Sequence, residues 1–291
     1  MGSTADYWRL TKPRVTIAIF LLFILAALAG AGSSIWRSTG EQMTRLTFGT
    51  VIVLMSVAGS NALNNRLDSD IDRLMGRTRL REIPSGRISS RSAERFGLSI
   101  LAVSAVLASL SEFYFPILLA VGLSSYLFLY TLILKRHNIL SVLATGPAVA
   151  SPVWAGWVIG RGYLDLAGLL TGLLVVVWGP LHLWSLATVF CEDYRSASVP
   201  MLPVVVGVRK SRLYILVLSL ILSAASLSLC FLGFYGGVYL VGMVLVNSLL
   251  LIILVASINW PSGRRNWILY KFSAPYMVVT LLFAAVDRLS V

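Results

Sequence analysis

The sequence has little charge and almost no cysteine. Only 12% of its 291 residues are charged, whereas a soluble domain carries about a quarter. The two cysteines and two histidines form neither a disulfide framework nor a Cys/His metal pattern. A net charge of +12 would suggest nucleic acid in a soluble protein, but here the basic residues flank apolar segments. We therefore expect a membrane protein with no nucleic-acid partner.

Long apolar segments recur along the whole chain. Their length, and the lack of alternation of the barrel-strand type, favour helices. The first segment lacks a cleavage site followed by a polar region, so we expect a retained span and not a signal peptide. The predicted fold is all-α, a polytopic nine-helix transmembrane bundle forming a single domain over residues 1–291. The nine predicted spans are 14–33, 46–66, 94–111, 115–134, 139–159, 166–189, 213–233, 236–258 and 268–287.

The basic residues are distributed unequally across the predicted membrane. All but four of the 24 lie on the side of the N-terminus. By the positive-inside rule, the N-terminus is cytoplasmic and the C-terminus lies outside. We expect most of these residues only to set the topology. The four basic residues on the opposite side of the predicted membrane are Arg37, Arg45, Arg161 and Arg288.

A cluster of amides and carboxylates ends the second segment. Asn64, Asp68 and Asp72 are spaced i, i+4, i+8, so a helix places them on one face. Their hard oxygen ligands suit Mg²⁺, whose open coordination positions are usually filled by phosphate oxygens. Asp70 lies about 200° round the helix from Asp68 and is expected to orient a neighbouring group instead. The cluster predicts a metal-bridged diphosphate site at the membrane surface.

A second acidic motif, Glu192 and Asp193, ends the sixth segment, four helices later. We expect it to face the first motif across a cytoplasmic cavity, where the metals would promote loss of diphosphate from an allylic carbon. The alternative is that the acids are solvated helix ends or partners of nearby arginines. Cationic residues that would clamp a diphosphate are Arg77, Arg79, Arg81, Lys135 and Arg136.

One of the two histidines lies within a predicted span. His137 sits in a charged loop and is expected to be solvated, whereas His182 lies inside the sixth segment. Ionisable residues within spans are costly and are candidates for function. Two interpretations stay open for His182: a neutral histidine hydrogen-bonded in the bundle, or a substrate contact such as an axial ligand to haem iron.

These motifs resemble the UbiA-type intramembrane prenyltransferases, through Asn64-Asn65-x-x-Asp68-x-Asp70-x-Asp72 followed by Met75-x-Arg77-Thr78. Ala197 stands where most members have a second aspartate four residues after Asp193, and the branch that farnesylates haem shares this loss. Glu82 stands where a proline is expected. Further stretches are similar to that branch and cover nearly the whole chain in the same order: 10–15, 130–131, 134–136, 180–187, 193–195, 200–204 and 287–289.

The resemblance implies a nine-helix bundle with a lateral opening to lipid for the prenyl chain. It implies Mg²⁺-dependent transfer of a farnesyl group from farnesyl diphosphate to haem B, giving haem O. Lys135 and Arg77, with Arg136 beside them, would bind diphosphate. Arg9, Arg14 and His182 would bind the acceptor, the arginines suiting a propionate. The metal–diphosphate site would comprise Asn64, Asp68, Asp72 and Asp193.

Two other functions remain open. The first is a prenyltransferase of the same fold with an aromatic acceptor of the 4-hydroxybenzoate type, or with a glycerol-phosphate lipid acceptor. The second is a transporter or channel, in which broken helices near the midplane are expected. The surface position of the acidic motifs argues against transport. The sequence predicts no oligomeric state.

Overall fold

The structure is a computed structural model that describes residues 2–37, 40–111 and 114–290. Within these ranges, nine helical segments are long and apolar enough to cross a membrane, and each overlaps one predicted span. The nine-helix prediction is therefore confirmed. The segments are α2 (Pro13–Ala31), α3 (Gly40–Leu67), α5 (Ser90–Ser109), α6 with η2 (Tyr114–Leu123, Ser124–Leu134), η3 with α7 (Ile139–Ala144, Thr145–Arg161), α8 (Leu166–Val189), α11 (Val208–Phe231), α12 (Gly237–Asn259) and α13 with α14 (Gly263–Ser273, Tyr276–Leu289).

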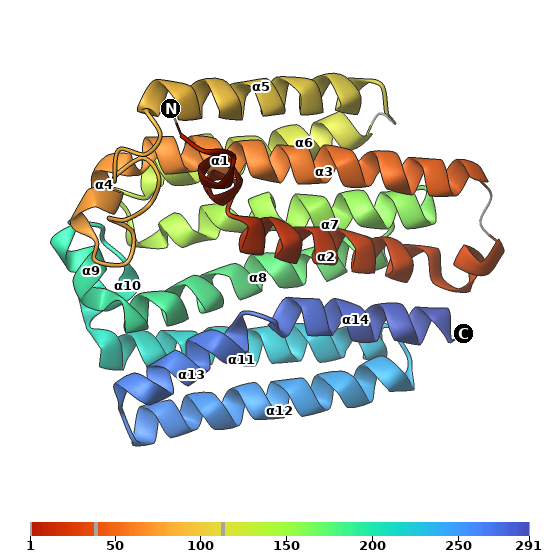
Figure 1. The fold of residues 1–291 in the computed structure, drawn as a ribbon. Helices are drawn as coiled ribbons and strands as arrows, with labels where there is room; N and C mark the ends of the chain where they lie inside the picture. The colour runs from red at the N-terminus through yellow and green to blue at the C-terminus, as the bar shows by residue number, and fades with distance from the viewer. Residues whose placement is uncertain (1, 38–39, 112–113, 291) are drawn as a thin grey trace.

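The long helices lie side by side, and the short elements gather at their ends (Figure 1). α2 packs against α7 and α14, α3 against α5, and α8 against α7 and α11. Three short helices lie at the left-hand end of Figure 1: α4 (Ser69–Leu74), α9 (Cys191–Ser196) and α10 (Leu202–Val206). Both acidic motifs therefore lie at the same end of the bundle. The remaining short elements are α1 (Thr4–Leu10) and η1 (Gly32–Arg37).

Small residues bring α2 and α7 into close contact. A Cβ atom added at Gly156 or Gly160 of α7 would overlap the α2 backbone at Phe23 or Ala27. In lipid, helices associate through packing of this kind, because burial of apolar surface between helices is no longer a strong driving force. The α2–α7 pair is thus closely packed within the bundle.

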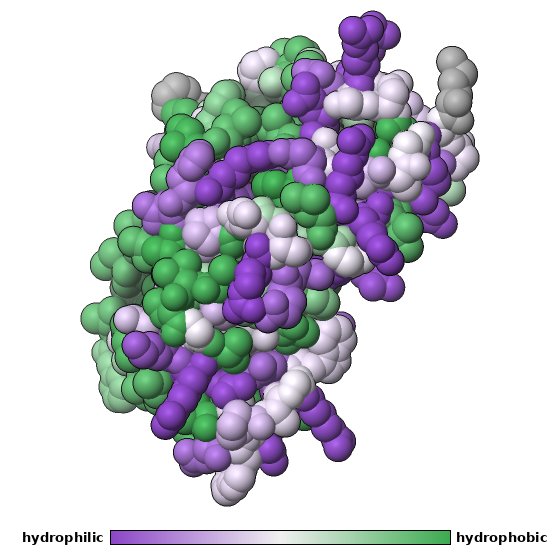
Figure 2. All heavy atoms as spheres, turned by 90° about the vertical axis from the view of Figure 1, so that its left-hand side faces the viewer, coloured by the Kyte–Doolittle hydropathy of each residue, from purple (hydrophilic) through white to green (hydrophobic). Residues whose placement is uncertain are grey.

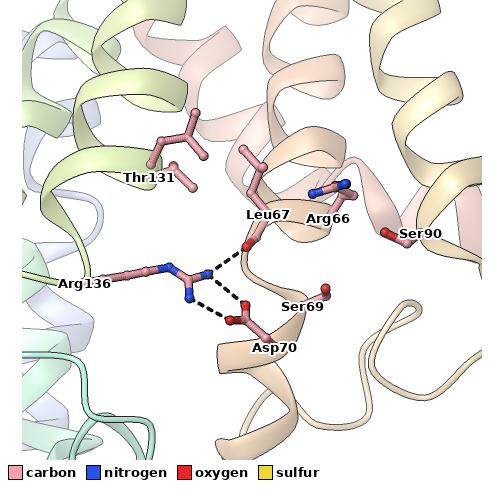
Figure 3. A pocket seen from close by; sticks show the side chains of 8 residues that line it. Arg66, Leu67, Ser69, Asp70, Ser90, Thr131 and Arg136 are labelled. Atoms are coloured by element: carbon pink, nitrogen blue, oxygen red, sulfur yellow. Dashed lines mark hydrogen bonds and ion pairs between the residues drawn. The ribbon is translucent and has the colours of Figure 1, made fainter.

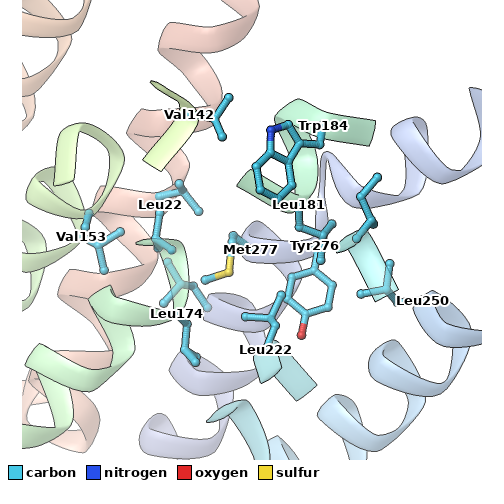
Figure 4. Packing of buried hydrophobic residues seen from close by; sticks show 14 of the residues in the cluster. Leu22, Val142, Val153, Leu174, Leu181, Trp184, Leu222, Leu250, Tyr276 and Met277 are labelled. Atoms are coloured by element: carbon cyan, nitrogen blue, oxygen red, sulfur yellow. The ribbon is translucent and has the colours of Figure 1, made fainter. Parts of the chain in front are cut away.

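The interior is apolar, and the outer surface is also largely apolar. Buried side chains from several helices interlock around Leu181, Leu222 and Met277 (Figure 4). Large hydrophobic residues such as Val106 and Ile252 are exposed, as expected for a lipid-facing surface.

The ninth span is broken at Ala274 and Pro275, between α13 and α14. α14 packs against α2 and α12, whereas α13 packs against α8 and α12. Near its far end, the buried Asp287 of α14 accepts hydrogen bonds from the backbone N–H groups of Gly236 and Tyr239, at 2.6 and 3.1 Å. This carboxylate caps the start of α12. The break between α13 and α14 allows α13 to pack against α8, the helix that carries His182.

Candidate active site

Hydrophilic side chains cover much of the end of the bundle that carries α4 and α9 (Figure 2). In this end the α3 hydrogen-bond pattern continues into α4. Asp68 N–H donates to Asn64 O at 2.9 Å, and Asp72 N–H donates to Asp68 O at 2.8 Å. The side chains of Asn64, Asp68 and Asp72 are all buried. The spacing i, i+4, i+8 is therefore kept as helical turns.

Two lysines bind the first pair of this motif. Lys12 Nζ donates to Asn64 Oδ1 at 2.6 Å, and Lys135 Nζ donates to Asp68 Oδ2 at 2.5 Å. Asn64 Nδ2 also donates to Asp68 Oδ2, at 2.9 Å. Burial, with Arg81 nearby as a second cause, lowers the pKa of Lys12 to about 7. The sequence prediction named Lys135 but missed Lys12, although its place directly before the first span was a usable signal.

Asp72, the third residue of the motif, is paired with an arginine. Arg81 donates to Asp72 Oδ2 at 2.7 Å, which places one of the predicted clamp residues at the motif. The buried Glu82, found where a proline was expected, accepts from Arg87 at 3.2 Å. Arg87 also binds Asp6, at 3.0 Å. The loop after α4 is therefore held by ion pairs, without the proline.

The oxygens of the motif fit a hard cation. Asp68 Oδ1 is buried and makes no hydrogen bond in the part of the chain that the structure describes. Among the residues that the structure describes, no three His, Cys, Asp or Glu side chains converge to hold a metal. A cation at this place would therefore use the Asn64 amide oxygen together with carboxylates, a donor set that suits Mg²⁺.

The second acidic motif packs against the loop that follows the first. Asp193 of α9 accepts from the backbone N–H groups of Gly76 and Arg77, at 3.2 and 3.1 Å. Ser196 Oγ donates to Leu74 O at 3.1 Å. Glu192 points elsewhere and forms an exposed ion pair with Arg195. The two motifs thus lie together, with Asp193 as the residue that joins them.

Arg136 binds Asp70, the carboxylate that does not share a helix face with Asn64, Asp68 and Asp72. It donates to both oxygens of Asp70, at 2.6 and 2.8 Å, and to Leu67 O at 3.0 Å (Figure 3). Arg136 holds the pKa of Asp70 at about 2. This pair lines a surface hollow of about 410 Å³ together with Thr131, whose hydroxyl accepts from Asn64 Nδ2 at 3.0 Å. Thr131 is a second contact of the motif that the sequence prediction did not assign.

The predicted acceptor arginines lie away from these contacts. Arg9 pairs with Asp6 at 3.8 Å, and Arg14 is exposed at the start of α2. Within the described residues neither forms an ion pair with Asp68 or Asp72.

A row of aromatic rings leads from the Arg77 loop to His182. The Arg77 guanidinium lies 4.9 Å from the centre of the Phe190 ring. Phe190 contacts Trp267, which contacts Tyr270, at centroid distances of 6.2 and 5.6 Å. Tyr270 stacks on His182 at 5.5 Å. The structure thus links the predicted diphosphate loop to the histidine within the sixth span.

Comparison with known proteins places these features in a family. The profile of the UbiA prenyltransferase family matches residues 16–279. Protoheme IX farnesyltransferase 1 of Cenarchaeum symbiosum is 38% identical over 282 residues, covering 95% of this chain and 92% of its own. Protoheme IX farnesyltransferase of Symbiobacterium thermophilum is 34% identical, covering 97% and 93%.

Solved structures share the fold. A structure from work on digeranylgeranylglyceryl phosphate synthase has a TM-score of 0.79 at 20% identity and covers 99% of both chains. A UbiA homologue from Archaeoglobus fulgidus, bound to GPP and Mg²⁺, has a TM-score of 0.73 at 18% identity, covering 98% of this chain and 100% of its own.

Proposed function

The chain belongs to the UbiA prenyltransferase family, and we propose that it transfers a farnesyl group from farnesyl diphosphate to haem B, giving haem O. One observation carries this proposal: several relatives with 31–38% identity over almost the full chain are protoheme IX farnesyltransferases. The buried Asn64–Asp68–Asp72 face, with its lysines, supplies the chemistry that an allylic diphosphate requires.

The metal site of this proposal uses oxygen donors already brought to one end of the bundle. Asn64, Asp68 and Asp72 would hold one Mg²⁺ and Asp193 a second, since Asp68 Oδ1 is buried without a partner among the described residues and each carboxylate oxygen accepts more than one bond. Bound there, Mg²⁺ would neutralise the charge that develops on the departing diphosphate. The Mg²⁺ in the Archaeoglobus fulgidus homologue supports this assignment.

The cations of the site would bind the diphosphate. Lys135 sits on Asp68, and Arg77 lies in the loop that Asp193 holds. Each offers donors for phosphate oxygens, and arginine does so with two parallel bonds. Arg136 would join them only by leaving Asp70, with which it makes two hydrogen bonds.

The transfer step follows from allylic chemistry. The C1–O bond breaks, and its electron pair leaves with the diphosphate. The π electrons of a haem vinyl group then form the new bond to C1. Water adds to the resulting cation and loses a proton. Exclusion of bulk water by the packed helices would protect the farnesyl cation until the vinyl group reaches it.

For the acceptor, we assign His182, Arg9 and Arg14 to haem binding, the arginines by attraction to propionates. We further propose that the motif end, with the N-terminus, faces the cytoplasm and that the C-terminus lies outside. The charge asymmetry of the chain supports this orientation.

The test uses the purified chain with farnesyl diphosphate, Mg²⁺ and haem B, with 4-hydroxybenzoate in a parallel reaction. Product masses are read with and without a chelator. A haem product heavier by one farnesyl unit and one water, and absent with the chelator, is the expected result. A prenylated hydroxybenzoate alone would overturn the haem assignment and leave the prenyltransferase site in place. Formation of the haem product with the chelator present would overturn the role of Mg²⁺.

A further inference from the structure

His182 lies inside a stack of nearly parallel rings contributed by α8 and α13. Trp178 stacks on one side at 5.0 Å and 7°, and Tyr270 stacks with it at 5.5 Å and 26°. The two neighbouring rings fix the plane of the imidazole. They leave the edge of the ring as the part through which it can meet a ligand.

Hydrogen bonds of Ser273 determine which imidazole nitrogen carries the proton. Ser273 Oγ donates its single hydrogen to Tyr270 O at 2.8 Å, and it lies 3.0 Å from His182 Nδ1. This pairing assigns the hydroxyl proton to Tyr270 O and makes Nδ1 the donor to Oγ. The remaining nitrogen, Nε2, therefore carries a lone pair.

That lone pair has no protein partner. Within the described residues Nε2 makes no hydrogen bond, and it is not fully buried. Histidines that bind metals almost always donate their other N–H to a fixed oxygen, as Nδ1 does here. An imidazole suits iron and not Mg²⁺, so His182 is separate in chemistry from the Asp68 site.

Lys271 places a cation beside the stack of Trp178, His182 and Tyr270. Lys271 Nζ is 4.8 Å from the centre of the Trp267 ring and 5.7 Å from that of Tyr270. Trp267 is 42% exposed, as is usual for a tryptophan near the end of a membrane span, so part of its ring is accessible. Aromatic rings with an ammonium group held over their faces fit a flat, apolar ligand that carries a carboxylate.

We propose that the acceptor haem docks against α8 and α13, with its iron on His182 Nε2 and a propionate on Lys271, which here takes the role assigned above to Arg9 and Arg14. An axial imidazole stands perpendicular to the macrocycle, so Trp178 and Tyr270 would meet it edge-on, a favourable aromatic arrangement. Ser273 is a positioning residue that acts by fixing the imidazole. This inference rests on the proposed function and locates its acceptor.

The test compares two ligands on the full chain in detergent, without farnesyl diphosphate. Haem B and metal-free protoporphyrin IX share the macrocycle and the propionates, but only haem has iron. His182→Gln should lower haem affinity at least about tenfold and remove the spectral signature of axial histidine. Ser273→Ala should lower haem affinity roughly tenfold, in line with other partners of metal-binding histidines. Neither change should weaken protoporphyrin binding.

Surface changes test the rest of the platform and cannot be confused with misfolding of the bundle. Trp267→Leu and Lys271→Gln should each weaken both ligands, by roughly two- to tenfold. His137→Gln, in the loop after η2, is the matched control and should change neither. Equal haem affinities for the wild type, His182→Gln and Trp267→Leu would overturn the docking site.

Farnesyl transfer is measured on the same preparations, which separates the two proposals. Haem farnesylation that His182→Gln and Trp267→Leu leave intact would overturn the site but keep the function. Haem binding that depends on His182, without any farnesyl transfer, would keep the site and overturn the function.

Discussion

Replacement of Lys135 by methionine tests whether lysine cations neutralise the Asp68 carboxylate in the absence of a bound metal ion. The Lys135–Asp68 pair is buried, with side-chain exposures of 11% and 3%. Removing one member of a buried pair leaves an uncompensated charge and costs about 3–5 kcal/mol. Methionine keeps most of the side-chain volume, so little of this cost should come from a cavity. In a chelator, Lys135→Met should lower the free energy of unfolding by this amount.

Magnesium should restore part of the loss. In the wild type, Lys135 competes with the metal for Asp68 Oδ2, and in the variant this competitor is absent. A ligand at a hundred times its Kd stabilises a protein by about 2.7 kcal/mol, and each tenfold gain in affinity adds about 1.4 kcal/mol at fixed concentration. Mg²⁺ should therefore stabilise the variant more than the wild type, while farnesyl transfer falls because the diphosphate has lost a cation.

The assay is reversible unfolding in mixed micelles, with and without Mg²⁺. The neighbouring Arg136→Met is the matched control, because the Arg136–Asp70 pair is exposed, at 36% and 64%. Exposed pairs contribute at most about 1 kcal/mol, and Asp70 is not a proposed metal ligand. The reasoning is refuted by equal losses for the two variants in chelator, or by a Mg²⁺ stabilisation of Lys135→Met no larger than that of the wild type.

Three further predictions follow from single contacts. Asp193→Ala should abolish farnesyl transfer measured by product mass, whereas Glu192→Ala, which changes its exposed neighbour, should not; full activity of the first would contradict its assignment. The pKa of Lys12 is lowered to about 7 in the folded chain. Between pH 7 and about pH 10 the unfolded chain therefore binds one more proton than the folded chain. The free energy of unfolding should therefore rise with pH over this window, by up to about 1.4 kcal/mol per unit; an equal slope in Lys12→Met would disprove this. Asp287→Ala should cost about 1–3 kcal/mol of stability, because the buried N–H group of Tyr239 and the part-buried N–H group of Gly236 lose their acceptor at the start of α12; an unchanged unfolding curve would show that water replaces it.

The spans could be predicted because each is a local property of the chain. A run of about 20 apolar residues suffices to identify a helix. Their ends were less predictable, since hydropathy falls where a helix continues beyond the apolar region. The ninth helix begins at Gly263 and not at 268, because Arg264, Arg265 and Asn266 extend it. The break at Pro275 was also missed, although proline there ends the preceding turn.

The shared face of Asn64, Asp68 and Asp72 could also be predicted from the sequence, because residues four apart on a helix are neighbours. Their partners were not. Lys12 lies 52 residues from Asn64 and Lys135 lies 67 residues from Asp68. Such pairs depend on which helices are adjacent, and neither periodicity nor spacing encodes that information. The same holds for the His182 stack, whose partners come from α13.

The charges at the motif also bear on the choice between a structural and a functional role for the acids. Asp68 and Asp72 do pair with cations, as the structural alternative expected. However, a buried ion pair is weak support for stability, since well-packed apolar residues of similar volume often stabilise a protein as much or more. A fold that needed only stability would have little use for Lys12, Lys135 and two aspartates in one buried place. The unpaired Asp68 Oδ1 adds a further cost that no contact of the described chain offsets. The arrangement is understandable if the same cations and carboxylates exchange their mutual contacts for Mg²⁺ and diphosphate, which bring the opposite charges with them.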